Sequence, residues 1–181
     1  MDHTEAIVEL HGIVDNKFVK HLTYFTKCKA KKNLEVFSGL NKNVRNVKGY
    51  HLTTDTPTDM FYWNTIKKEI ERLYSFYKIK FPKMTNDKVH QIDLLKYSPG
   101  GKYEIHTDHG TKAPRHLSII INLNDNYEGG DLVFTDQRDY EIKRCKLKKG
   151  SIVFFPSNFM YPHTIESITK GTRYSIVAWL Q

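Results

Sequence analysis

QIDLLKYSPGGKYEIHTD, residues 91–108, is the stretch that decides the fold of this chain. Two short runs with strand-like composition flank a Pro-Gly-Gly turn signal, so the stretch predicts two strands joined by a tight turn. Side chains at i and i+2 of a strand point to one face, so we expect His106 and Asp108 to project together and His109 to point away. A histidine and a carboxylate on one face are two candidate metal ligands.

Short runs of the same texture follow one another from residue 89 onward. Turn residues, mostly glycine, separate them, and no helical pattern intervenes. Many short strands with tight turns indicate a sandwich or a jelly roll. The expected strands are residues 90–97, 103–108, 116–123, 131–134, 140–145, 151–156, 161–165 and 173–180.

The front of the chain has apolar residues at helical spacing instead. Asp15 is a good N-cap, and residues 16–28 are expected to form a first helix. A second helix is expected after Thr58. Residues 38–58 between the two helices are polar and carry turn signals, which indicates an extended segment. The apolar face of the second helix is expected to comprise Phe61, Ile66, Ile70, Leu73 and Tyr77.

Composition favours one folded domain. Hydrophobic residues make up 39% of the chain and aromatic residues 13%, which can form a core, so disorder is not expected. No internal repeat or linker divides the sequence. We expect an α+β fold with residues 1–181 as a single domain, in which a helical front, residues 1–88, packs on a β-rich half, residues 89–181.

Charge and cysteine usage limit the partners and the compartment. No run approaches the roughly 18 apolar residues of a membrane span, so no membrane partner is expected. Two cysteines lie far apart and in no metal-like spacing, which favours a reduced cytoplasmic protein. The net charge of +8 is concentrated in residues 27–32, 42–48 and 143–149. Such runs are usually solvated faces, but their field leaves an acidic or nucleic-acid partner open.

A third metal ligand has to come from elsewhere in the chain. His163, in YPHTI, is the best candidate because its strand can neighbour the first one in a rolled sheet. Two histidines and one carboxylate form the facial triad of non-haem Fe(II) oxygenases. A structural zinc site competes with this interpretation, but it normally has four protein ligands, often cysteines. The triplet alone also occurs by chance in surface clusters.

Arg173 supports the interpretation as a functional site. It follows His163 by ten residues and opens the last expected strand. Its planar fork can hold a carboxylate through two hydrogen bonds, which a lysine cannot do. Ser175 shares its face and can donate to the same carboxylate. The alternative for Arg173 is a salt bridge at the rim of the fold.

Five motifs in order resemble a known family. They are QIDLLKYSPGGKYEIHTD, EGGDLVF, KGSIVFFPS, YPHTI and GTRYSIVAW. Together they resemble the catalytic domain of the prolyl 4-hydroxylase-like 2-oxoglutarate/Fe(II) dioxygenases over residues 89–181. Residues 1–88 resemble the helical, substrate-facing front of such proteins only loosely. The resemblance implies a double-stranded β-helix (jelly roll) core with supporting N-terminal helices.

The resemblance also implies roles for the candidate residues. His106, Asp108 and His163 would be the iron ligands. Arg173 would hold the distal carboxylate of 2-oxoglutarate, and Ser175 would share that contact.

Four more residues match family positions around the co-substrate. Tyr97 is implied to hydrogen-bond the co-substrate or the substrate, whereas Tyr103 lines the pocket or packs in the core. Asn122 stands where some relatives place a tyrosine or threonine that touches the distal carboxylate, so the partner of Arg173 is left open. Trp179 is implied as a pocket wall or as ordinary core.

The implied activity is hydroxylation of a substrate C–H bond, with release of succinate and CO2. The resemblance implies Fe(II), 2-oxoglutarate and O2 as cofactor and co-substrates, with ascorbate binding as a further expectation. A prolyl residue of a protein or peptide is the leading substrate. Another side chain, a free amino acid or an alkylated nucleobase are the alternatives, and a non-catalytic binding module on the same fold is the competing class.

A last expectation concerns residues 39–59. This polar segment lies between two helical stretches, and loops of such length in a compact domain are usually lids or disordered. The corresponding region of the resembled family flanks the substrate groove. We therefore expect a lid in which Arg45, Lys48 and Tyr50 meet the substrate, with a solvated connector as the alternative.

Overall fold

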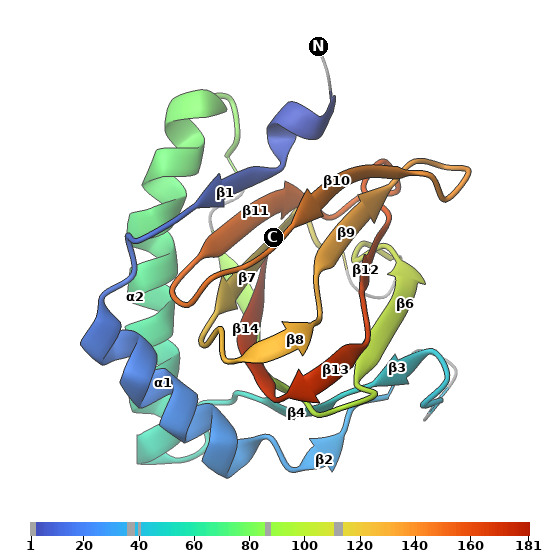
Figure 1. Ribbon diagram of the computed structural model, residues 1–181. Helices are drawn as coiled ribbons and strands as arrows, with labels where there is room; N and C mark the ends of the chain where they lie inside the picture. Colours follow the sequence, from blue (N-terminus) through green and yellow to red (C-terminus); the bar gives the residue numbers. More distant parts are fainter. Residues whose placement is uncertain (1–2, 36–38, 40, 86–87, 111–113) are drawn as a thin grey trace.

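Two antiparallel sheets enclose the interior of the protein. The computed structural model describes residues 3–35, 39, 41–85, 88–110 and 114–181 (Figure 1). The large sheet has the strand order β1-β11-β7-β14-β5-β4-β2 and the smaller one the order β10-β9-β12-β6-β3. Strands β8 and β13 form a separate two-stranded sheet. The described part of the fold is therefore a rolled, jelly-roll-like sheet pair, as predicted.

The strands of the large sheet are β1 (Val8–Leu10), β2 (Lys32–Asn33), β4 (Lys48–His51), β5 (Val89–Tyr97), β7 (Leu117–Asn122), β11 (Ile152–Pro156) and β14 (Arg173–Leu180). Those of the smaller sheet are β3 (Arg45–Asn46), β6 (Lys102–His106), β9 (Leu132–Thr135), β10 (Glu141–Cys145) and β12 (His163–Ile165). The remaining elements are η1 (His3–Ala6), α1 (Asn16–Lys29), α2 (Pro57–Lys80), β8 (Tyr127–Gly129) and β13 (Ile168–Gly171).

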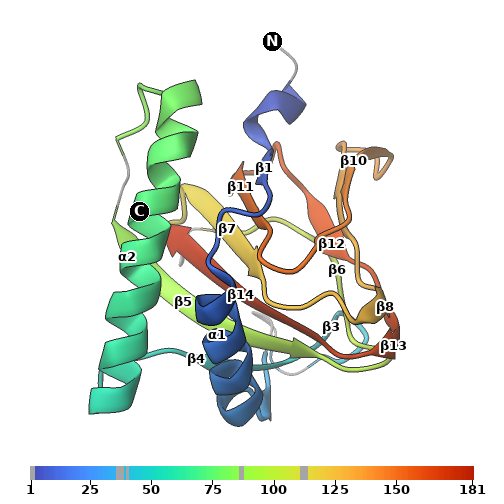
Figure 2. The same ribbon diagram turned by 60° about the vertical axis from the view of Figure 1, so that its left-hand side comes forward.

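Both helices cover the outer face of the large sheet, as Figure 2 shows. Strand β14 shows how this face differs from the inner one. Its residues Ile176, Ala178 and Leu180 pack with the helices, whereas Val177 and Trp179 belong to a second apolar cluster inside the rolled sheets. Because both faces of the strand are buried, its sequence reads as a continuous apolar run. The alternation directs every second residue of β14 into the interior.

The helix predictions are confirmed, with one correction at the second helix. Asp15 caps α1 by accepting hydrogen bonds from two backbone N–H groups. Helix α2 begins at Pro57, with Thr56 as its N-cap, and not after Thr58. Proline suits the first helical position because its missing N–H would have no partner there. Phe61 is 63% exposed, and the neighbouring Tyr62 is the partly buried residue that packs against the core, stacked on Phe25.

The expected lid is corrected by the structure, although Leu40 lies outside the described residues. Strand β4 pairs with β5 on one side and with β2 on the other, and β3 pairs with β6. The segment was expected to be a loop because short polar strands lack a hydrophobic pattern. Neighbouring strands provide the hydrogen bonds of residues 45–46 and 48–51, so these residues are fixed parts of the two sheets.

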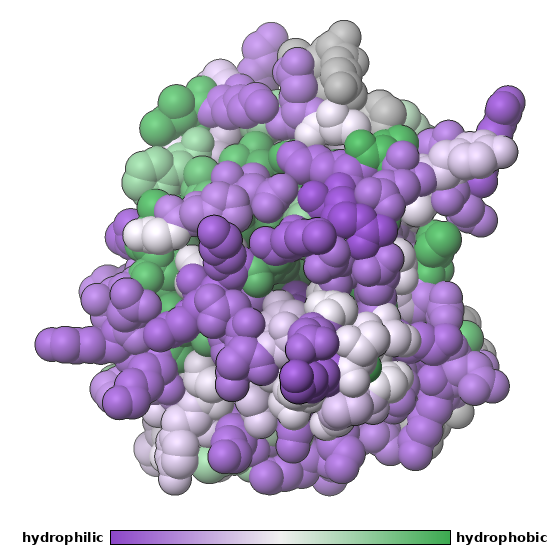
Figure 3. Space-filling view, viewed as in Figure 1, coloured by the Kyte–Doolittle hydropathy of each residue, from purple (hydrophilic) through white to green (hydrophobic). Residues whose placement is uncertain are grey.

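The surface carries the excess positive charge. Figure 3 shows mainly hydrophilic residues on one face of the molecule. Part of the charge of the basic run 143–149 is neutralised, since Arg144 forms ion pairs with Asp131, Glu141 and Glu166. Within the described ranges, no helix is both long and apolar enough to cross a membrane.

The pairing of β4 on both sides predicts slow backbone hydrogen exchange. The amide of Leu52 also donates to the carbonyl of Ile92 at 2.9 Å. We expect amides of residues 48–52 to exchange on the order of minutes to hours, because exchange needs the strand to open. Hydrogen exchange followed by mass spectrometry checks this, with the exposed loop residues 125–126 as the fast control. Exchange of both segments at the same rate would mean that residues 48–52 open readily, and it would support the expectation of a lid.

Candidate metal centre and co-substrate pocket

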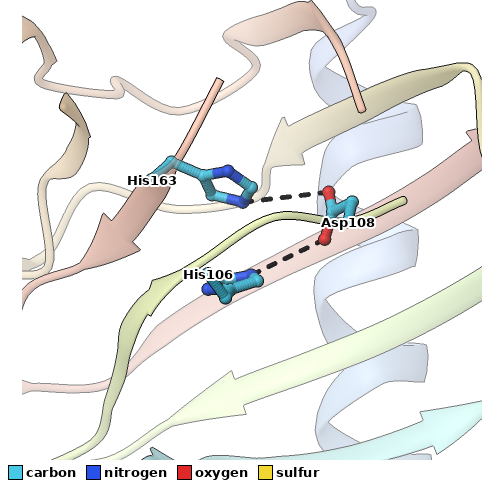
Figure 4. A group of neighbouring side chains, drawn as sticks. All are labelled: His106, Asp108 and His163. Atoms are coloured by element: carbon cyan, nitrogen blue, oxygen red, sulfur yellow. Dashed lines mark ion pairs between the residues drawn. The ribbon is translucent and has the colours of Figure 1, made fainter. Parts of the chain in front are cut away.

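Three candidate ligands meet at one end of the smaller sheet. His106 is the last residue of β6, and His163, the first residue of β12, lies opposite it in the strand register. Asp108 follows two residues after the end of β6. The possible ligand atoms of the three residues lie within 4.8 Å of one another, in the arrangement of Figure 4. The proximity expected from strand parity is confirmed.

The hydrogen bonds of both imidazoles aim Nε2 at the centre of this cluster. His106 Nδ1 lies 2.8 Å from the carbonyl of Glu104, and His163 Nδ1 lies 3.1 Å from the carbonyl of Tyr161. A carbonyl oxygen only accepts, so Nδ1 must carry the proton and donate. Each Nε2 then keeps its lone pair, at 3.6 Å from Asp108 for His106 and 3.8 Å for His163. Such second contacts fix the tautomer of metal-binding histidines.

Asp108 is held as a buried carboxylate. The hydroxyl of Ser118 donates to Asp108 Oδ2 at 2.6 Å, and Ser157 lies 2.7 Å from the same hydroxyl. Burial disfavours its charge, but His163, His106 and the Ser118 hydrogen bond together hold the pKa of Asp108 below its usual range. The carboxylate therefore stays ionised at neutral pH, with Oδ1 not taken by the serine.

His163 is in the form that binds a metal. Burial, together with the neighbouring His106, lowers its pKa to about 4. The imidazole is therefore neutral at physiological pH, and only neutral imidazole has a free lone pair for coordination.

His109 lies outside this cluster, as strand parity predicts. Its Nδ1 lies 2.7 Å from the carbonyl of Arg115, and the metal-like group of the described residues comprises only His106, Asp108 and His163.

A pocket adjoins the three ligands, and Arg173 is its main charged donor. It is lined by the three ligands together with Tyr97, Tyr103, Arg173, Ser175 and Trp179, among others. Arg173 is only 1% exposed, and its Nε donates to Asn122 Oδ1 at 3.1 Å. Its Nη2 and the Ser175 hydroxyl have no hydrogen-bond partner in the part of the chain that the structure describes. Within the described residues no carboxylate pairs with Arg173.

The aromatic residues expected around the co-substrate all line this pocket. Burial raises the pKa of the Tyr97 hydroxyl, which therefore remains a protonated donor. The ring of Tyr103 stacks on His106 with 3.5 Å between centroids. Trp179 forms a wall of the pocket and also belongs to the apolar cluster inside the rolled sheets, so both alternatives hold for it.

Asn122 has a different position from the one expected. It is fully buried and is not among the residues that line the pocket. Its Nδ2 donates to the carbonyls of Asn124 and Leu147, which orients its oxygen toward Arg173. Asn122 therefore orients the guanidinium from the side away from the pocket, and Nη2 of Arg173 is available to a ligand.

The structure corrects the expectation that three residues of the lid meet the substrate, but only in part. Tyr50 lies opposite Leu94 and Lys48 opposite Lys96 in the pairing of β4 with β5, which places both on the helix-covered face. Tyr50 packs against the apolar cluster under the helices. Both residues therefore point away from the pocket, because register decides the face of a strand residue. Arg45 does line the pocket.

Two residues at the site were not identified from the sequence. Ser118 is a polar residue inside an apolar strand, and that contrast was a usable signal of a functional contact. Arg115 gave no signal, because it precedes β7 in an irregular segment. In the structure its guanidinium lies 3.6 Å from the ring centroid of Trp179.

The donor chemistry fits a facial-triad iron site with an anionic co-substrate beside it. Two neutral imidazoles and one carboxylate are the ligands of that iron class, with the remaining positions open. A buried guanidinium without a carboxylate partner is costly, and an anion that binds it removes this cost. The Ser175 hydroxyl adds a second donor for the same anion. The residues present therefore fit both Fe(II) and a dicarboxylate such as 2-oxoglutarate.

Comparison with known proteins agrees with this site. Residues 92–181, which carry all three candidate ligands and Arg173, match the family model described as the 2OG-Fe(II) oxygenase superfamily. Among curated proteins it is 35% identical over 98 residues to a PKHD-type hydroxylase of Prochlorococcus marinus, a match that covers 52% of this chain and 42% of the relative. The matches with the first curated relatives span about two fifths to one half of the length of those proteins.

Solved structures share the fold. The chain is similar to a prolyl-4-hydroxylase of Pseudomonas putida, with a TM-score of 0.79 and 15% identity over 97% of this chain and 92% of the other. It is also similar to a prolyl hydroxylase of Trichoplax adhaerens, solved with a peptide fragment of hypoxia inducible factor. That TM-score is 0.77, with 15% identity over 98% of this chain and 84% of the other. At this identity the similarity establishes the jelly-roll fold.

The Ser118–Asp108 hydrogen bond predicts an effect on metal affinity. Outer partners of metal ligands typically change affinity about 10–100-fold when removed, because they fix the ligand. We expect Ser118→Ala to weaken Co(II) binding by roughly tenfold, measured by isothermal titration calorimetry. Ser75→Ala, on the exposed side of α2, is the matched control. An affinity of Ser118→Ala within twofold of that of the control would mean that the serine does not orient Asp108.

Proposed function

We propose that this protein is an Fe(II)- and 2-oxoglutarate-dependent dioxygenase that hydroxylates a prolyl residue of a protein or peptide. The observation that carries the proposal is the pairing of two features in one pocket. A His-Asp-His cluster with metal-like geometry lies beside a buried arginine that has no carboxylate partner among the described residues. A binding module of the same fold would not need both features.

In this proposal His106, Asp108 and His163 hold Fe(II), while Arg173 and Ser175 hold the distal carboxylate of 2-oxoglutarate. When bound, Fe(II) and 2-oxoglutarate would supply the oxidant: one oxygen atom of O2 would enter the substrate C–H bond, the other would enter succinate, and the C1 carboxylate of 2-oxoglutarate would leave as CO2.

The protein's own residues position the reactants and exclude water. Asn122 fixes the Arg173 fork, and the Tyr97 hydroxyl is a further donor in the same pocket. Apolar side chains of Leu95, Ile120 and Val177 line the rest of it. A pocket of this kind strengthens charged contacts and keeps water from the reacting groups.

The choice of a prolyl substrate rests on similarity. A curated relative is named a PKHD-type hydroxylase, and two structures of the same fold are named prolyl hydroxylases. One of these was solved with a peptide, which supports a peptide or protein as the substrate here.

The proposal predicts succinate formation that depends on Fe(II), 2-oxoglutarate and O2. With proline-containing peptides, mass spectrometry is expected to find a product heavier by one oxygen atom. His163→Ala is expected to abolish turnover and to weaken metal binding. Wild-type activity of this variant would show that the ligand assignment is wrong.

The role of Arg173 has its own test. Arg173→Lys is expected to raise the KM for 2-oxoglutarate roughly tenfold or more, because a single ammonium replaces a fork in a buried site. Metal affinity is expected to stay the same. Arg138→Lys, on an exposed turn, is the matched control. An unchanged KM in Arg173→Lys would place the co-substrate elsewhere.

A further inference from the structure

A second cavity of about 310 Å³ opens beside the co-substrate pocket. Arg45, Tyr103, Asp108 and Trp179 line both spaces, so the cavity leads directly to the candidate metal centre. We call it the vestibule. Arg115 lines only the vestibule.

The vestibule contains hydrogen-bond donors that lack acceptors. Three of its residues carry a buried nitrogen that has no partner among the described residues, namely Nε of Arg45, Nε of Arg115 and the indole Nε1 of Trp179. Each such N–H has lost its contact with water and gained nothing in return, which is unfavourable. Three such donors on residues that line one cavity indicate that the cavity takes an acceptor-bearing group.

The two arginines also lack counter-ions. Neither forms an ion pair within the described part of the chain, although both have fixed positions. Arg115 donates to Gln91 Oε1 at 2.8 Å and lies over the Trp179 ring. Arg45 donates to the carbonyl of Glu35 at 3.1 Å and lies 4.6 Å from the ring centroid of Tyr103. Two cations held on aromatic rings are ready to bind an anion without reordering.

The charges of the two arginines affect each other. Arg45 and Arg115 line the same cavity, so their like charges repel each other, and Asp108 and Asp93 in the same lining offset part of this repulsion. Asp93 is already engaged by His51 and Gln91. Asp108 belongs to the metal cluster. An additional anion between the arginines would therefore relieve their repulsion.

We propose that the vestibule binds a carboxylate of the substrate, through Arg45, Arg115 and the indole N–H of Trp179. This inference rests on the proposed function, because it concerns the substrate of the same site. The carboxylate comes from an acidic residue next to the reacting one in a peptide, or from the reacting amino acid itself. A nucleic acid fits less well, since Glu35, Asp93 and Asp108 in the same lining would repel a chain of phosphates.

Binding without turnover tests the inference separately from the proposed function. The protein is loaded with Mn(II) and 2-oxoglutarate, and probe affinities are measured by calorimetry. Two pairs of probes are peptides: acetyl-Ala-Pro-Glu-Ala-amide with its glutamine counterpart, and acetyl-Ala-Glu-Pro-Ala-amide with its glutamine counterpart. The third pair is L-proline and L-prolinamide. A decanucleotide of thymidine tests the polyanion alternative.

We expect one pair to show a preference for the carboxylate of about ten- to a hundredfold, as charge-assisted hydrogen bonds contribute. The pair that shows it identifies the source of the carboxylate. Arg115→Gln and Arg45→Gln are each expected to reduce that preference, and Arg115→Lys to restore part of it. Arg138→Gln, which removes an exposed arginine, is expected to retain it.

Other outcomes overturn the inference. Equal affinity for carboxylate and amide in every pair would do so, as would an unchanged preference in both vestibule variants. Tighter binding of the decanucleotide than of any carboxylate probe, lost in Arg115→Gln, would assign the vestibule to nucleic acid. Failure of the proposed function looks different, because carboxylate binding would then be observed without any succinate production.

Discussion

The burial of one charged group, the guanidinium of Arg173, is the constraint on which the interior of this protein depends. A charge inside a protein is tolerated only when hydrogen bonds and a counter-ion offset its lost hydration. Asn122 provides one hydrogen bond, and its own amide is fixed by two carbonyls behind it. The rest of the guanidinium faces the pocket, and no carboxylate of the described residues forms an ion pair with it. An anion bound at this guanidinium, as proposed for the co-substrate, would offset the buried charge.

The rolled pair of sheets makes this arrangement possible. Strand β14 has one face under the helices and the other toward the interior, so alternate residues serve stability and function separately. Arg173, Ser175 and Trp179 share the inner face and therefore line the same pocket. The metal ligands come from the opposite sheet, where β6 and β12 lie side by side. The co-substrate pocket lies between the two sheets for this reason.

Hydrogen bonds to the three candidate ligands fix the orientation of their side chains, which the backbone positions alone do not fix. Backbone carbonyls select the tautomer of both histidines, and Ser118 occupies one oxygen of Asp108. Each contact comes from a different part of the chain, so the cluster is formed only when both sheets are folded. The vestibule extends the same principle, because Arg115 reaches it from an irregular segment and is held by Trp179 and Gln91.

The sequence by itself determined the helices, most strands of the second half and the three candidate ligands. Strand parity, turn residues and N-caps are local, and they can be read without knowing distant neighbours. The tertiary structure alone decided the pairing of β4 and the side to which Lys48 and Tyr50 point, because register depends on the partner strand. It also decided that Asn122 orients Arg173 and that Arg115 joins the site. Those contacts link residues far apart in the chain, and no local pattern records them.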